Sequence, residues 1–135
     1  MTFSDAIRSG FDNYVNFEGR ASRAEFWWWF LFAILVSIAA NIIDAIIGAP
    51  IFSLLAGLGL LLPNLAMSVR RLHDTNRSGW WILIGLIPLI GFIVLLIFYL
   101  EQGTPGPNEH GPPPSDAPAA PTAQQAPPPP PPPAA

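Results

Sequence analysis

The sequence predicts an all-α integral membrane protein with three transmembrane helices, a short amphipathic interfacial helix before them and a disordered proline-rich C-terminal tail. Long apolar runs cover residues 26–47, 51–69 and 80–100, and about 20 helical residues cross the roughly 30 Å hydrocarbon core of a bilayer. Such runs lack the polar face that a helix of a soluble protein turns to water. From residue 112 the chain is rich in Pro, Ala and Gln, a composition that cannot build a packed core. We therefore expect one small helical membrane domain over residues 1–111 and a disordered tail over residues 112–135.

The distribution of arginine predicts the topology. The chain has no lysine, and its arginines lie either before the first apolar run or between the second and third, at Arg8, Arg20, Arg23, Arg70, Arg71 and Arg77. Tryptophans at 27–29 and 80–81 lie beside these clusters, as indole rings do at a membrane interface. Two crossings separate the clusters, so both lie on one side, which the positive-inside rule makes cytoplasmic. The sequence predicts a multi-pass protein of the cytoplasmic membrane, with its N-terminus in the cytoplasm and its C-terminus outside.

Two short patterns define the beginning of the domain. Phe3, Ile7 and Phe11 recur at helical spacing with polar residues between them. This pattern predicts a helix that either lies in the interface with its aromatic side chains toward lipid or packs on the protein's own loops. Ser22 and Glu25 have the spacing of a capping box before an apolar run, so we expect the first membrane helix to begin there.

Polar residues within the apolar runs are the candidate intramembrane site residues. Asn41 and Asp44 share a face of the first run with small residues, and Asn64 lies on a similar stripe of the second. Such faces usually point toward another helix rather than toward lipid. Antiparallel packing would place Asn41 and Asn64 at different depths, about 10 Å apart, so they are not expected to form one site. Pro63 and Pro88 are expected to bend their helices and free a carbonyl.

The segment 70–81 holds the densest group of chemically active side chains. Arginine forks match phosphate and carboxylate geometry, and a cluster beside the bilayer suits anionic headgroups. The candidate lipid- or partner-binding residues are Arg70, Arg71, His73, Asp74 and Arg77, together with Arg20 and Arg23. The alternative is that the arginines only fix the topology, while His73 and Asp74 tie this loop to the charged residues of segment 18–25.

Several kinds of site are not expected. The chain has no cysteine, which excludes disulfides and thiolate sites. His73 has no second histidine nearby, because His110 is expected across the membrane, and a metal site usually needs three or four ligands. No nucleophile, phosphate-binding glycine loop or nucleic-acid module is evident. The sequence therefore predicts no catalytic residues, no metal, no cofactor and no nucleic-acid partner.

Ordered motifs over residues 11–111 resemble a known bacterial family. They are GRASR at 19–23, EFWW at 25–28, Pro63, RRLHD at 70–74, RSGWW at 77–81, PLIG at 88–91 and a glycine-rich turn from Gly103 to Gly111. With these motifs the chain resembles domain of unknown function 805, which includes the YhaH-like inner-membrane proteins. Asn76 stands where this family often has glycine, and His110 replaces its usual aromatic residue. The resemblance implies a small bacterial inner-membrane protein without an established activity, so it supplies no catalytic residues.

Three hypotheses of function follow. The first is a non-enzymatic module that binds a protein partner or anionic membrane lipid at its arginine-rich cytoplasmic face. The expected partners are membrane lipids and either another membrane protein or further copies of the same chain in a homo-oligomer. The second is a subunit of a small oligomeric transporter or channel, which would use the intramembrane polar residues. The third is a membrane enzyme that acts on lipid headgroups through His73 and Asp74.

Overall fold

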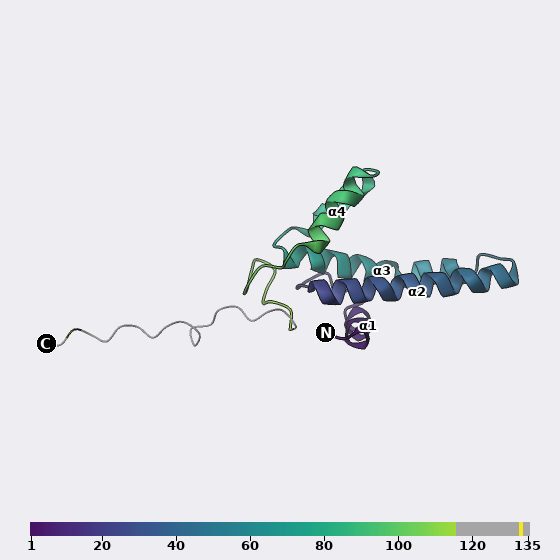
Figure 1. Ribbon diagram of the computed structural model, residues 1–135, viewed down its shortest axis with the longest axis horizontal. Helices are drawn as coiled ribbons and strands as arrows, with labels where there is room; N and C mark the ends of the chain where they lie inside the picture. The colour runs from purple at the N-terminus through teal and green to yellow at the C-terminus, as the bar shows by residue number, and fades with distance from the viewer. Residues whose placement is uncertain (116–132, 134–135) are drawn as a thin grey trace.

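A computed structural model describes residues 1–115 and residue 133 of the chain. Its elements are α1 (Phe3–Asp12), α2 (Arg23–Ile47), α3 (Phe52–Asp74), the 3₁₀ helix η1 (Gly79–Leu86) and α4 (Ile90–Leu100) (Figure 1). Within the described residues all regular elements are helical, which confirms the predicted all-α class. Residues 116–132, 134 and 135, which hold most of the predicted tail, lie outside the described residues.

Helices α2 and α3 form a long antiparallel hairpin (Figure 1). Both are long and apolar enough to cross a membrane, since 25 and 23 residues span about 37 and 35 Å. Helix α2 begins after Ser22, whose side chain accepts a hydrogen bond from the Glu25 N–H at 3.1 Å, as the capping pattern predicts. It ends at Gly48, whose φ of 75° needs the left-handed freedom of glycine. Most of the large apolar side chains of the hairpin are exposed, a surface suited to lipid rather than water.

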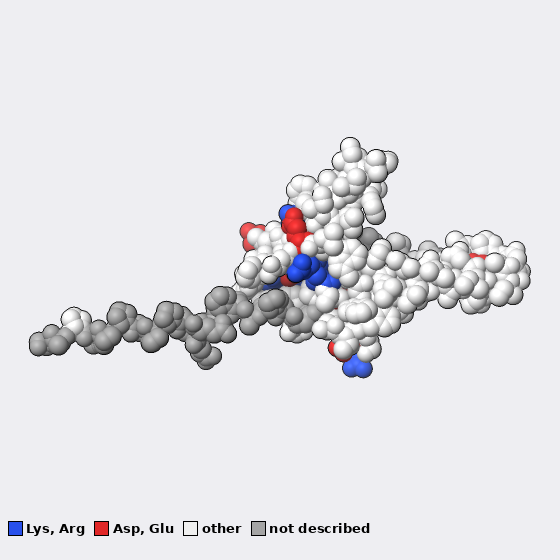
Figure 2. Space-filling model, viewed as in Figure 1, with Lys and Arg blue, Asp and Glu red and all other residues white. Residues whose placement is uncertain are grey.

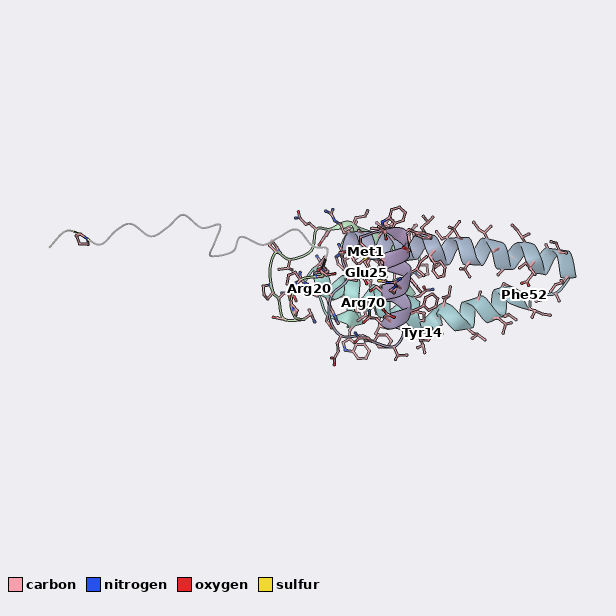
Figure 3. All side chains as sticks on the ribbon, turned by 90° about the horizontal axis from the view of Figure 1, so that it is seen from below. Met1, Tyr14, Arg20, Glu25, Phe52 and Arg70 are labelled. Atoms are coloured by element: carbon pink, nitrogen blue, oxygen red, sulfur yellow. The ribbon has the colours of Figure 1, made fainter. Side chains whose placement is uncertain are left out.

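Helix α1 lies across α2 and α3 (Figure 3). Thr2 and Asp5 form a capping box at its start, and the hydrogen bonds from Thr2 lower the pKa of Asp5. Phe11 packs edge-on against the Trp29 ring with centroids 5.3 Å apart, and Gly10 lies so close to Trp29 that a Cβ would overlap it. Of the two placements that the sequence left open, the structure shows α1 packed on the protein.

Pro63 allows a second contact between the N-terminal region and α3. A proline cannot donate a hydrogen bond to the carbonyl four residues earlier, which here belongs to Gly59. The Tyr14 hydroxyl donates to that carbonyl. The predicted free carbonyl is thus observed, and its bond to Tyr14 fixes the segment after α1 to α3.

The predicted third span, residues 80–100, is not one helix. The chain reverses at Ile87–Leu89, so that η1 and α4 lie side by side as a second hairpin, inclined away from α2 and α3 (Figure 1). Pro88 breaks the helix because it lacks an N–H and disfavours helical backbone before it. Leu89 adopts a φ of 65°, and the Ile90 N–H donates to the Pro88 carbonyl at 2.7 Å. With 8 and 11 residues, each arm is about 16 Å long, roughly half a span.

The second hairpin returns the chain to the end of α3 from which it left. Glu101, directly after α4, forms an ion pair with Arg77, two residues before η1, at 2.6 Å. The ring of His110 stacks on that of His73, with centroids 3.9 Å apart. The prediction that the C-terminal segment and His110 lie across the membrane from the arginine clusters is therefore wrong. The positive-inside rule could not detect this return, because residues 78–135 contain no arginine or lysine.

Candidate functional site: a buried arginine network

The predicted binding residues gather at one end of the α2–α3 hairpin. Charged side chains concentrate near the junction of α3 and α4, while most of the surface in this view is uncharged (Figure 2). Arg20, in the segment that follows α1, and Arg70, near the end of α3, lie at this end beside α1 (Figure 3). The charged side chains that are buried here, among the described residues, are those of Arg20, Glu25, Arg70, Arg71 and Asp74. Long apolar helices thus end in a compact charged cluster.

Asp74 is the centre of this cluster. Its Oδ1 accepts a hydrogen bond from Arg20 Nε at 3.0 Å, and its Oδ2 accepts one from Arg71 Nη1 at 2.6 Å. Gly103 packs on the same carboxylate so closely that a Cβ there would overlap it. A carboxylate between two buried guanidiniums neutralises charge that would be costly to leave unpaired. The alternative that Asp74 ties its loop to segment 18–25 is what the structure shows.

Arg20 holds the C-terminal turn to this centre. Its Nη1 donates to the Gly106 carbonyl at 2.6 Å, and its Nη2 donates to the Thr104 carbonyl at 2.5 Å. The Thr104 N–H in turn donates to the Asp74 carbonyl at 2.7 Å. One arginine before α2 therefore fixes a turn more than eighty residues later in the chain.

Arg71 is completely buried and joins three segments. Besides Asp74, it donates to the carbonyls of Ala21, Tyr99 and Glu101. A guanidinium carries five donors in a fixed fork, and these contacts engage all three nitrogens within the protein. Arg71 therefore links the segment before α2 and the end of α4 to α3, and its buried guanidinium is not placed to reach lipid or a partner.

Arg70 is buried with fewer acceptors. Its Nη1 contacts Glu25 Oε1 at 3.2 Å, and Ser9 of α1 donates to the same oxygen. Its Nη2 meets only the Met67 sulfur, at 3.8 Å, and its Nε has no hydrogen-bond partner among the described residues. Arg70 also lines a pocket of about 240 Å³, whose other walls come from α1, the segment 13–20, Glu25 and residues 114–115.

His73 and His110 form a parallel stack on the other side of the turn. His73 Nδ1 is 3.0 Å from the Gly19 carbonyl, and the Asn108 amide donates to the His73 carbonyl at 2.9 Å. With Glu18 and Glu109, the rings line a cavity of about 270 Å³. No group of three or more His, Cys, Asp or Glu residues in the described part of the chain could hold a metal ion. The sequence missed His110 as a neighbour of His73, since the predicted topology separated them.

The remaining arginines are more accessible. The side chain of Arg77 is 26% exposed, and its guanidinium lies 3.9 Å from the centroid of the Phe98 ring. Arg23 is exposed on the first turn of α2 and makes one long hydrogen bond, 3.4 Å, to the Leu100 carbonyl. Arg8 is exposed on α1. The sequence did not select Arg8, because it lies outside the motif-rich segments.

The intramembrane candidates do not converge. Asp44 accepts hydrogen bonds from the N–H groups of Phe52 and Ser53, at 2.7 and 2.9 Å, and therefore caps the start of α3. Asn64 accepts a hydrogen bond from the Trp29 indole at 2.8 Å. Asn41 donates to its own helix, at 2.7 Å. These hydrogen bonds of Asn41 and Asn64 share no partner. A cavity of about 150 Å³ between α2 and α3 includes Asn64 but neither Asn41 nor Asp44.

Comparison with known proteins gives the family. The model of the family described as "Protein of unknown function (DUF805)" matches residues 14–112, which contain the whole network from Arg20 to Gly111. "Inner membrane protein YhaI" of Escherichia coli (strain K12) is 46% identical over 104 residues, covering 76% of this chain and 88% of that protein. "Inner membrane protein YhaH" of the same strain is 40% identical over 112 residues, covering 78% and 93%. No solved structure matches the chain. The chain is therefore a membrane protein that belongs to the DUF805 family.

Proposed function

We propose that the protein is a non-enzymatic module of the bacterial inner membrane that binds anionic lipid, or a protein partner, at its arginine-bearing end. The names of the relatives YhaI and YhaH support this location. In the proposed topology α2 and α3 are the two crossings, the arginine-bearing end is cytoplasmic, and the apolar η1–α4 hairpin enters the cytoplasmic leaflet without crossing it. The N- and C-terminal segments are then on the same side.

One observation supports lipid in particular: the arginines divide into two sets. Arg20, Arg70 and Arg71 are buried. Arg8 and Arg23 are exposed and Arg77 is partly exposed. Arg23 shares α2 with the exposed Trp28, and Arg77 closely precedes the exposed Trp80 and Trp81. Helix α1, which carries Arg8, contacts Trp28 through Phe3. Arginine beside tryptophan is the combination that favours the headgroup layer. The residues proposed to bind lipid at the surface are therefore the accessible set, while Arg20 and Arg71 hold segments of the fold together.

The proposal predicts that replacing both Arg8 and Arg23 with alanine weakens retention of anionic lipid. A basic residue near an anionic surface contributes about 1 kcal/mol, so the pair would change retention roughly thirtyfold. Native mass spectrometry of protein extracted from vesicles of phosphatidylglycerol and phosphatidylethanolamine measures this. The matched control replaces the same two arginines with lysine, which keeps the charge and should keep most of the lipid. Equal lipid retention by wild type and the double alanine variant would contradict the lipid proposal.

The transporter hypothesis gains no support from Asp44, because the hydrogen bonds described above engage its carboxylate as a helix cap. Its neighbour in the sequence pattern, Asn41, bonds to the backbone of its own helix. Both roles are structural, and the accessible arginines are the better basis for a functional test.

A further inference from the structure

Arg70 differs from the other two buried arginines in how its donors are used. Arg20 and Arg71 each donate through all three guanidinium nitrogens to oxygen atoms of the protein. Within residues 1–115, Arg70 donates to a single oxygen, of Glu25. Its side chain is 95% buried (5% exposed), and a buried donor without an acceptor costs about 1–3 kcal/mol. The guanidinium of Arg70 is therefore suited to a further acceptor.

The net charge of the buried cluster also favours a bound anion. Among the described residues, the buried charges at this end are three positive, those of Arg20, Arg70 and Arg71, against two negative, those of Glu25 and Asp74. The difference is one positive charge. A buried charge without a counterion is costly, so an anion would be stabilised here. Glu18 also lines the cavity but is exposed, so water screens its charge.

The cavity beside Arg70 has the size and lining for such a group. Its volume of about 240 Å³ is below the usual range for whole drug-sized ligands, about 300–1,000 Å³, and suits a headgroup. Neutral donors and charged groups line it together, including Ser9, Asn13, Asn16, Arg20, Glu25 and Arg70. The Ser9 hydroxyl donates to Glu25, and the amides of Asn13 and Asn16 donate to Ser9 and Asn13. Among the described residues, the unused donor at this wall is therefore that of Arg70, whose planar fork matches phosphate oxygens.

We infer that this cavity binds a phosphate oxyanion, with Arg70 as its main donor and Asn13 at its wall. The oxyanion is either the phosphodiester of a phospholipid headgroup or free phosphate. This inference deepens the proposed function, since it adds one specific internal site, but it uses none of the accessible arginines.

The test is native mass spectrometry of the detergent-solubilised protein with three probes: dioctanoyl phosphatidylglycerol, inorganic phosphate and dioctanoylglycerol. Two variants alter the site differently. Arg70→Lys keeps a cation for Glu25 but loses the planar fork, and Asn13→Leu fills the cavity without removing a charge. We expect each to weaken binding of the phosphate-containing probe at least tenfold. Asn41→Leu, on the exposed face of α2, is the matched control and should bind like wild type.

Binding of phosphatidylglycerol alone would assign the site to a lipid phosphodiester, and binding of inorganic phosphate would assign it to free phosphate; both support the inference. Three results would overturn it: no binding of either probe by wild type, equal binding of dioctanoylglycerol, or binding that both variants leave unchanged. The double alanine variant of Arg8 and Arg23 separates the two proposals, because it should lose surface lipid but keep the tenfold difference caused by Arg70→Lys.

Discussion

Replacing Asp74 with alanine is expected to lower the free energy of unfolding by about 3–5 kcal/mol, the usual cost of removing one partner from a buried ion pair. Asp74 is 4% exposed and accepts from both Arg20 and Arg71. Without it, two buried guanidiniums face each other with only carbonyl acceptors. The loss should also loosen the C-terminal turn, because the Asp74 carboxylate holds Arg20 in place. Arg20 in turn donates to the carbonyls of Gly106 and Thr104.

Thermal unfolding of the detergent-solubilised protein, followed by circular dichroism, measures the effect, and limited proteolysis near residue 104 reports the release of the turn. Glu109→Ala is the matched control, since Glu109 is an exposed carboxylate of the same turn. It should change stability by no more than about 0.5 kcal/mol. An Asp74→Ala protein that unfolds and resists protease like wild type would show that the network does not hold the turn.

Replacing Gly91 with leucine is expected to separate η1 from α4. A Cβ on Gly91 would lie 2.7 Å from the carbonyl carbon of Ile84 and overlap its oxygen. These are backbone atoms, which cannot move aside as a flexible side chain can. Forced packing of this kind costs about 1–3 kcal/mol or more, and moving the two arms apart would relieve it.

Spin labels at exposed positions 83 and 93 would report the distance between the arms. We expect a short distance in the parent protein and a longer, broader distribution in Gly91→Leu. Gly57→Leu controls for adding a leucine to a membrane helix, because a Cβ on Gly57 has no neighbour within 4 Å. An unchanged distance distribution in Gly91→Leu would mean that the two arms do not pack in this way.

The elements that local patterns determine were predicted correctly. The capping spacing of Ser22 and Glu25 located the start of α2, because a cap depends on residues close in the chain. The end of α3 was placed too early, at residue 69, since hydropathy falls where arginines begin. The helix continues to Asp74 because Arg70 and Arg71 are buried in the network and need not reach water.

The second hairpin could not be recognised from hydropathy. A full span and two half-length arms have the same apolar composition, and Pro88 is compatible with a bend as well as with a reversal. The decisive contact is between Gly91 and the backbone of Ile84, which only the three-dimensional structure reveals. The same error placed His110 away from His73, and it hid the contacts of Arg20 with the C-terminal turn.

The central claim is that the second hairpin returns the chain, so that both ends of the described domain lie on one membrane face. Because the chain has no cysteine, single cysteines at Thr2, Ala49 and Gln102 can be labelled in intact cells with a membrane-impermeant maleimide. The account predicts labelling of the Ala49→Cys protein alone, while Thr2→Cys and Gln102→Cys react only after the membrane is permeabilised. Labelling of Gln102→Cys together with Ala49→Cys in intact cells would restore three crossings and contradict the account.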